Sequence, residues 1–176
     1  MAAQSRWKFR ATMILTGLLV SMVGLSSAHA DTVRVPAAGI SAPVHAVGTT
    51  SAGIVIPENP QHVGWWKRSA RNRDHHGSSI LVGHVSDSHL NRGVFGKLTH
   101  TKVGQVVIWE TGGVVKRYRI VSKRKYLRSR ALPSRLFRST GPHLLRMITC
   151  TNLVHMPDGY FHYTKNLVVT AREISR

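Results

Sequence analysis

Short apolar runs bounded by turn residues recur along the chain, while helical periodicity is weak throughout. Runs of this length are typical of strands, so the pattern predicts a mostly β domain. Many short strands joined by turns favour a closed barrel or a sandwich, and closure would leave no exposed sheet edge. The expected strands are 32–35, 42–47, 54–56, 80–85, 105–110, 114–123, 144–149 and 167–174.

The segments between these strands differ in character. Thr111-Gly112-Gly113 is a strong hairpin signal between two expected strands. Trp65 and Trp66 are expected to pack against the domain from an otherwise polar loop. The expected connections are loops at 58–79 and 152–165, helical turns at 93–98 and 134–137, and a long basic connection at 124–143.

Residues 1–30 follow the plan of an export signal. Basic residues precede an apolar stretch, and residues 28–30 read Ala-His-Ala, a small-x-small pattern that favours cleavage before Asp31. The alternative is an uncleaved membrane anchor, since the apolar stretch is close to the roughly 20 residues that span a bilayer. We therefore expect an exported protein, at the extracellular face of the membrane or in the cell wall, with one domain at 31–176.

The chain is strongly basic, with 25 Lys+Arg against seven Asp+Glu and a net charge of +18. Three of the basic residues and no acid lie in residues 1–30, so the remainder carries +15. Such a charge indicates anionic surroundings, and export favours an anionic cell envelope over nucleic acid. Much of the charge lies between Lys116 and Arg138, where the alternative is a basic face that only meets solvent.

The chain has one cysteine, Cys150, at the end of the expected strand LLRMITC. Exported proteins usually pair their cysteines, so an unpaired thiol in this place suggests a nucleophile. A thiol attacks as the thiolate and therefore needs a base or a cationic neighbour near neutral pH. His84 ends a second apolar run, ILVGHV, and is the leading candidate for that neighbour. The alternative is a structural or surface histidine, because the chain holds 11 of them.

A metal site is a competing use of the histidines at 75, 76, 84 and 89. Their spacing matches no standard zinc pattern, and no second cysteine is available to join them. The sequence also has no acidic cluster suited to calcium. We therefore expect neither a metal nor another cofactor.

Two motifs stand in a fixed order, GHV at 83–85 and ITC at 148–150, framed by VPAAGI at 35–40 and VGWW at 63–66. With this set the chain resembles the sortases, and it is most similar to the short actinobacterial class F or class E type. The likeness runs from about residue 33 to 174. Either motif alone would be weak, but the ordered pair is specific.

The resemblance implies a single closed eight-stranded β-barrel with short helical turns, and a catalytic domain at 31–176. It also implies a cysteine transpeptidase that cleaves an LPXTG-like sorting signal through a thioacyl-enzyme. An amine from a cell-wall precursor or a pilin would then resolve that intermediate. Cys150 would be the nucleophile, His84 the general acid and base, and Thr149 would help to position substrate or the oxyanion through its hydroxyl or backbone.

One position departs from the family pattern. Sortases use an arginine at or just before the last strand, where class F members often read YRDNVVV, but this chain reads YTKNLVV with Thr164 at the arginine position. Lys165 is the nearest cation, although it lacks the planar fork of a guanidinium. The alternatives are an arginine from the basic segment 124–138, or reduced activity.

Two other classes of function compete with this interpretation. The first is a catalytically impaired sortase-like barrel that binds anionic cell-wall polymer, which the high charge and the missing arginine favour. The second is an L,D-transpeptidase, which Met147-Ile148-Thr149 disfavours because those enzymes carry histidine and glycine close before the cysteine. Hydrolysis of the thioacyl intermediate, in place of transfer to an amine, is also open.

Overall fold

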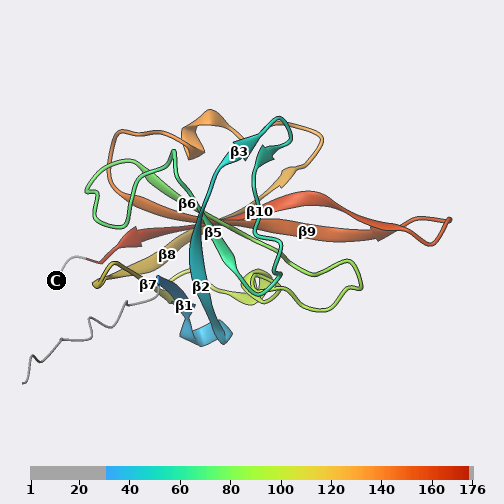
Figure 1. The fold of residues 1–176 in the computed structure, drawn as a ribbon, viewed down its shortest axis with the longest axis horizontal. Helices are drawn as coiled ribbons and strands as arrows, with labels where there is room; N and C mark the ends of the chain where they lie inside the picture. Colours follow the sequence, from blue (N-terminus) through green and yellow to red (C-terminus); the bar gives the residue numbers. More distant parts are fainter. Residues whose placement is uncertain (1–30, 175–176) are drawn as a thin grey trace, which may run out of the picture.

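The computed structural model describes residues 31–174, and strands account for most of its regular structure (Figure 1). The export signal predicted at 1–30 lies outside the described residues. The barrel strands are β1 (Thr32–Val35), β2 (Ile40–Val47), β5 (Val63–Trp66), β6 (Ser78–Gly83), β7 (Val106–Thr111), β8 (Val114–Leu127), β9 (Leu144–His155) and β10 (Phe161–Glu173). The remaining elements are a small sheet of β3 (Thr49–Thr50) and β4 (Gly53–Ile54), and the 3₁₀ helices η1 (Pro36–Ala38), η2 (Leu98–His100) and η3 (Ser134–Leu136).

The eight barrel strands close in the order β1-β2-β5-β6-β9-β10-β8-β7, which confirms the expected mostly β, closed-barrel fold. Most neighbours are antiparallel, but β2 pairs in parallel with β5, and β6 pairs in parallel with β9. The second pairing places Val82 opposite Ile148. Since these two strands run the same way, the residues that follow Val82 and Ile148 meet at one edge of the barrel. Within residues 31–174, no helix has the length and apolar character needed to cross a membrane.

Alternate residues of the strands pack into two apolar clusters on opposite faces of the sheet. Leu145 and Met147 of β9 are fully buried in the larger cluster, which fills the barrel. Arg146 and Ile148 alternate with them and therefore lie on the outer face. A second cluster covers that face and contains Val47, Ile80, Val82, Leu136, Ile148 and Val168. Leu136 belongs to residues 128–143, here named the β8–β9 connection, so this connection packs onto the outside of the barrel.

The prediction of a loop over 58–79 is wrong for residues 63–66. These residues form β5, which pairs with both β2 and β6. Its four residues are too few to show a clear period. Trp65 packs against the inner cluster and Trp66 against the outer one, which confirms the packing role expected for this pair. The strand expected at 54–56 is shorter than predicted, since β4 ends at Ile54.

The loop predicted over 152–165 is also wrong, because β9 continues to His155 and β10 begins at Phe161. The segment is a hairpin that projects away from the barrel (Figure 1). Both of its faces meet solvent, so it lacks the apolar alternation that marks a half-buried strand. The helical turn expected at 93–98 occurs later, as η2, whereas the turn expected at 134–137 corresponds to η3.

Candidate active site

Cys150 lies midway along β9, just before this strand extends into the projecting hairpin, and it is directly opposite Asn166 of β10. Its side chain is half-buried and lines a pocket of about 550 Å³, here named the Cys150 pocket. Apolar residues form much of the wall, with Ile54 and Ile56 from the β3–β4 side and Phe137 from the β8–β9 connection. The lone thiol therefore opens into a cavity that is mostly apolar and large enough for several side chains.

His84 follows β6 immediately, and the parallel β6–β9 register brings it to the same barrel edge as Cys150. Its Nε2 lies 3.0 Å from the Pro57 carbonyl oxygen. Because a carbonyl only accepts, this Nε2 carries the hydrogen, and Nδ1 is the nitrogen available to take up a proton. In the part of the chain that the structure describes, His84 makes no hydrogen bond to Cys150.

Glycines fix the path of the backbone around His84. A Cβ on Gly83 would lie 2.8 Å from the buried ring of Phe95, and a Cβ on Gly93 would lie 2.5 Å from the His84 carbonyl oxygen. That oxygen accepts a hydrogen bond from the Phe95 backbone at 2.9 Å. The GH motif thus has a physical basis, since any side chain at residue 83 would displace the strand end that presents His84.

Thr149 is buried, and its Oγ1 donates to the Gly83 carbonyl oxygen at 2.8 Å. The hydroxyl therefore ties the middle of β9 to the end of β6, directly beside both candidate catalytic residues. With its hydroxyl proton engaged in this bond, the Thr149 side chain has no hydrogen left to donate to an oxyanion.

Arg128 is a cation beside the thiol that sequence reasoning did not single out. It follows β8, its backbone N–H donates to the Thr164 carbonyl at 2.9 Å, and its Nη1 donates to the Tyr163 carbonyl at 3.2 Å. Its side chain lines the Cys150 pocket. The pairing of β8 with β10 thus brings an arginine next to Thr164, although the two residues are far apart in the sequence.

Lys165 lies differently from Arg128. It sits between Thr164 and Asn166 on β10, where alternation places it on the face of Leu167 and opposite to the face shared by Asn166 and Cys150. It does not contribute to the wall of the Cys150 pocket. The geometry therefore favours Arg128 over Lys165 as the cation of this site.

The electrostatics of the thiol reflect two opposing effects. Burial raises the pKa of Cys150, and the positive charge of Arg128 partly opposes that rise. Without substrate, Cys150 is therefore mostly protonated near neutral pH, and it needs a proton acceptor to become a thiolate.

The sequence matches the sortase domain over residues 33–174. This chain belongs to the sortase family. The solved structure of a lid mutant of sortase A from Corynebacterium diphtheriae is similar, with 17% identity, a TM-score of 0.63, and coverage of 84% of this chain and 70% of that one. Sortase C-1 from Actinomyces oris shares 20% identity at a TM-score of 0.61, over 83% of this chain and 74% of that one. Comparison with curated protein sequences finds no significant match.

Sortases are cysteine transpeptidases, so membership gives this chain that general chemistry. Cys150 is its only cysteine, which makes it the one thiol that can serve as nucleophile. The low identities to the solved sortases support the shared barrel, and the roles of individual side chains rest on the geometry of this chain.

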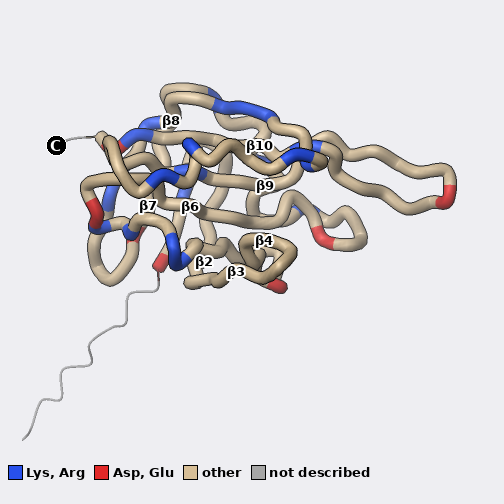
Figure 2. Tube along the Cα trace, turned by 90° about the horizontal axis from the view of Figure 1, so that it is seen from above, with Lys and Arg blue, Asp and Glu red and all other residues tan. Residues whose placement is uncertain are grey.

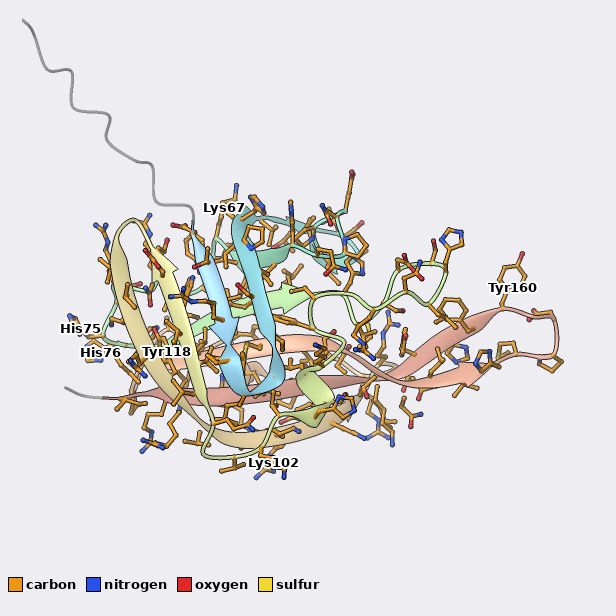
Figure 3. The ribbon with its side chains drawn as sticks, turned by 90° about the horizontal axis from the view of Figure 1, so that it is seen from below. Lys67, His75, His76, Lys102, Tyr118 and Tyr160 are labelled. Atoms are coloured by element: carbon orange, nitrogen blue, oxygen red, sulfur yellow. The ribbon has the colours of Figure 1, made fainter. Side chains whose placement is uncertain are left out.

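Two histidines of the alternative metal set, His75 and His76, lie away from this edge (Figure 3). His75 and His76 sit at the end of the barrel opposite the hairpin that carries Tyr160 (Figure 3). The length of β6 separates His76 from His84 by on the order of 20 Å, at roughly 3.3 Å per residue. Across residues 31–174, no three His, Cys, Asp or Glu side chains come close enough together to hold a metal ion.

Proposed function

We propose that this protein is an exported sortase of the class F type that cleaves an LPXTG-like sorting signal and transfers it to an amine of the cell envelope. The observation that carries the proposal is the convergence of Cys150, His84 and Arg128 on one edge of the barrel. The acceptor would be an amine of a cell-wall precursor or of a pilin. One of the similar solved structures is described as a sortase C2 of a Group B Streptococcus pilus island.

In the first half of the reaction, His84 takes the proton of the Cys150 thiol. The thiolate attacks the carbonyl carbon of the Thr–Gly bond, and the carbonyl oxygen becomes an oxyanion. Arg128 is placed to donate to that oxyanion, with the backbone beside Thr149 as a further donor. The C–N bond then breaks as His84 gives its proton to the leaving amine, and a thioester to Cys150 remains.

The second half reverses these roles. The incoming amine attacks the thioester carbonyl and loses a proton to His84, and the C–S bond breaks. The new amide leaves, and Cys150 recovers its proton from His84. If water takes the place of the amine, the same steps give hydrolysis.

The shape of the Cys150 pocket supports a peptide substrate. Ile54, Ile56 and Phe137 provide apolar surface for the leucine and proline of a sorting signal, beside the thiol that would attack at its threonine. The same wall includes Arg128, whose guanidinium is suited to peptide carbonyl oxygens.

Intact-mass analysis of the full chain, incubated with an LPXTG peptide, tests the proposal directly. We expect an acyl adduct on the wild-type protein, none on Cys150→Ala, and strongly reduced turnover by His84→Ala. Addition of a small amine should convert the adduct into an amide product.

Two outcomes of this peptide experiment would contradict the proposal. If Cys150→Ala cleaves the peptide as fast as the wild type, the proposal is wrong. If neither protein reacts with any peptide of a related panel, while both bind anionic wall polymer in a salt-sensitive way, the non-catalytic barrel is the better description.

A further inference from the structure

A second pocket on the outer face of the barrel is strongly basic. It has a volume of about 250 Å³ and lies between β8, β9, β10 and the β8–β9 connection. Four arginines line it, namely Arg124, Arg135, Arg138 and Arg146, and no aspartate or glutamate does. Figure 2 shows that Lys and Arg positions recur along β8 and beside β10, whereas Asp and Glu are few and lie apart. We name this cavity the Arg146 pocket.

Arg146 is the buried arginine of this pocket, with only 7% of its surface exposed. Its Nε donates to Ser78 Oγ at 3.2 Å, and its Nη1 donates to Thr170 Oγ1 at 3.0 Å. Both partners are neutral hydroxyls that hold the guanidinium in place. Its Nη2 makes no hydrogen bond to any residue of 31–174.

The charge of Arg146 also has no internal counterion. The ion pairs between residues 31–174 involve Glu110 and Glu173, and neither pairs with an arginine of this pocket. A buried unpaired charge is costly, so buried arginines are normally matched by an anion. In this pocket, the protein supplies several cations and no anion.

The neighbouring arginines add to the imbalance. Burial lowers the pKa of Arg146, and the positive charge of Arg138 lowers it further. Arg135 and Arg138 are exposed, so their guanidiniums are free to turn toward a ligand in the pocket. Several guanidiniums around one small cavity match the charge and geometry of a tetrahedral oxyanion, because the planar fork donates two parallel hydrogen bonds to phosphate.

We propose that the Arg146 pocket binds a phosphate group, as a monoester or a diester, between Arg146 and the exposed pair Arg135 and Arg138. Ser78 and Thr170 orient the buried guanidinium, and its Nη2 provides the first ligand contact. The site does not depend on transpeptidation, since it shares no lining residue with the Cys150 pocket.

Calorimetric titration of the full chain tests this site, with inorganic phosphate and dimethyl phosphate as separate probes at constant ionic strength set by sodium chloride. We expect one saturable site for at least one probe. Arg146→Met and Arg138→Gln should each weaken binding by at least about tenfold, since each removes charge-assisted hydrogen bonds. Arg138 is exposed, so its variant should fold even if Arg146→Met does not.

Arg117→Gln is the matched control, because Arg117 is an exposed arginine of β8 that lies outside the pocket. It removes the same charge and should leave the affinity within about twofold. Binding of dimethyl phosphate would identify a diester as a sufficient ligand, and binding of phosphate alone would assign a free or terminal phosphate. The proposal is overturned if neither probe binds the wild type, or if Arg117→Gln weakens binding as much as Arg138→Gln.

Discussion

Replacing Arg128 with glutamine is the sharpest perturbation of the candidate active site, because it removes a charge beside Cys150 and keeps a polar side chain of related length. In the structure, Nη1 of Arg128 donates to the Tyr163 carbonyl at 3.2 Å, so the guanidinium is held against β10 where the family's arginine would lie. Arg128 is exposed, and its loss should leave the barrel intact.

The expected size of the effect follows from this geometry. Removing one donor to an oxyanion typically costs about 2.7–4 kcal/mol in the transition state. The exposure of Arg128 favours the lower limit, and about 2.7 kcal/mol corresponds to a fall in kcat of roughly 100-fold. Arg128→Lys keeps the charge but loses the planar fork, so it should recover only part of the activity.

The assay is cleavage of a fluorescent LPXTG peptide under single-turnover conditions, with thermal unfolding as a check on folding. Arg130→Gln serves as the matched control, because Arg130 lines the same pocket and is also exposed. It should reduce the rate far less. Full activity in Arg128→Gln, together with a large loss in Lys165→Gln, would refute the assignment and return the role to Lys165.

Three further predictions follow from individual contacts. Gly83→Ala should lower the free energy of unfolding, measured by urea titration, by about 1–3 kcal/mol, because the new Cβ would lie 2.8 Å from the Phe95 ring. Gly48→Ala is the control and should change this free energy little, because a Cβ at Gly48 would have nothing within 4 Å. The rate of Cys150 alkylation should rise with pH to a midpoint above that of a free cysteine, and Arg128→Gln should move the midpoint higher still. His143 is buried, and its pKa is lowered mainly by that burial, so the free energy of unfolding should fall as the pH drops below about 6.5. His143→Gln should reduce the slope of this fall by up to about 1.4 kcal/mol per pH unit.

The strands that the sequence predicted correctly are those with a buried face. β1, β2, β6 and β7 carry apolar residues in runs or alternation, and their cores coincide with the expected ranges. β5 was missed because four residues show no period. The outer part of the β9–β10 hairpin was missed because solvent lies on both sides, so no apolar pattern marks it.

The location of the candidate site could be predicted only for residues that a local sequence pattern marks. Cys150 and His84 each end an apolar run, and the structure places both at one barrel edge. Arg128 depends on the pairing of Lys165 with Leu127 across β8 and β10, a register that no local pattern encodes. The sequence alone therefore did not identify which arginine of the basic segment, if any, would lie near the thiol.

Arg146 did leave a signal in the sequence, as a single arginine inside the apolar run LLRMITC. Such a residue, flanked by Leu145 and Met147 that fill the barrel, must lie on the other face of the strand. The fold then covers that face with the β8–β9 connection, which buries the arginine instead of exposing it to solvent.

The β8–β9 connection thus gives structural meaning to the charge between Lys116 and Arg138. Its first residue, Arg128, borders the Cys150 pocket, while Arg135 and Arg138 border the Arg146 pocket. Leu136 and Phe137, which lie between Arg135 and Arg138 in the sequence, pack onto the outer apolar cluster and fix the connection to the barrel. Because apolar contacts hold the segment in place, its arginines line two separate pockets.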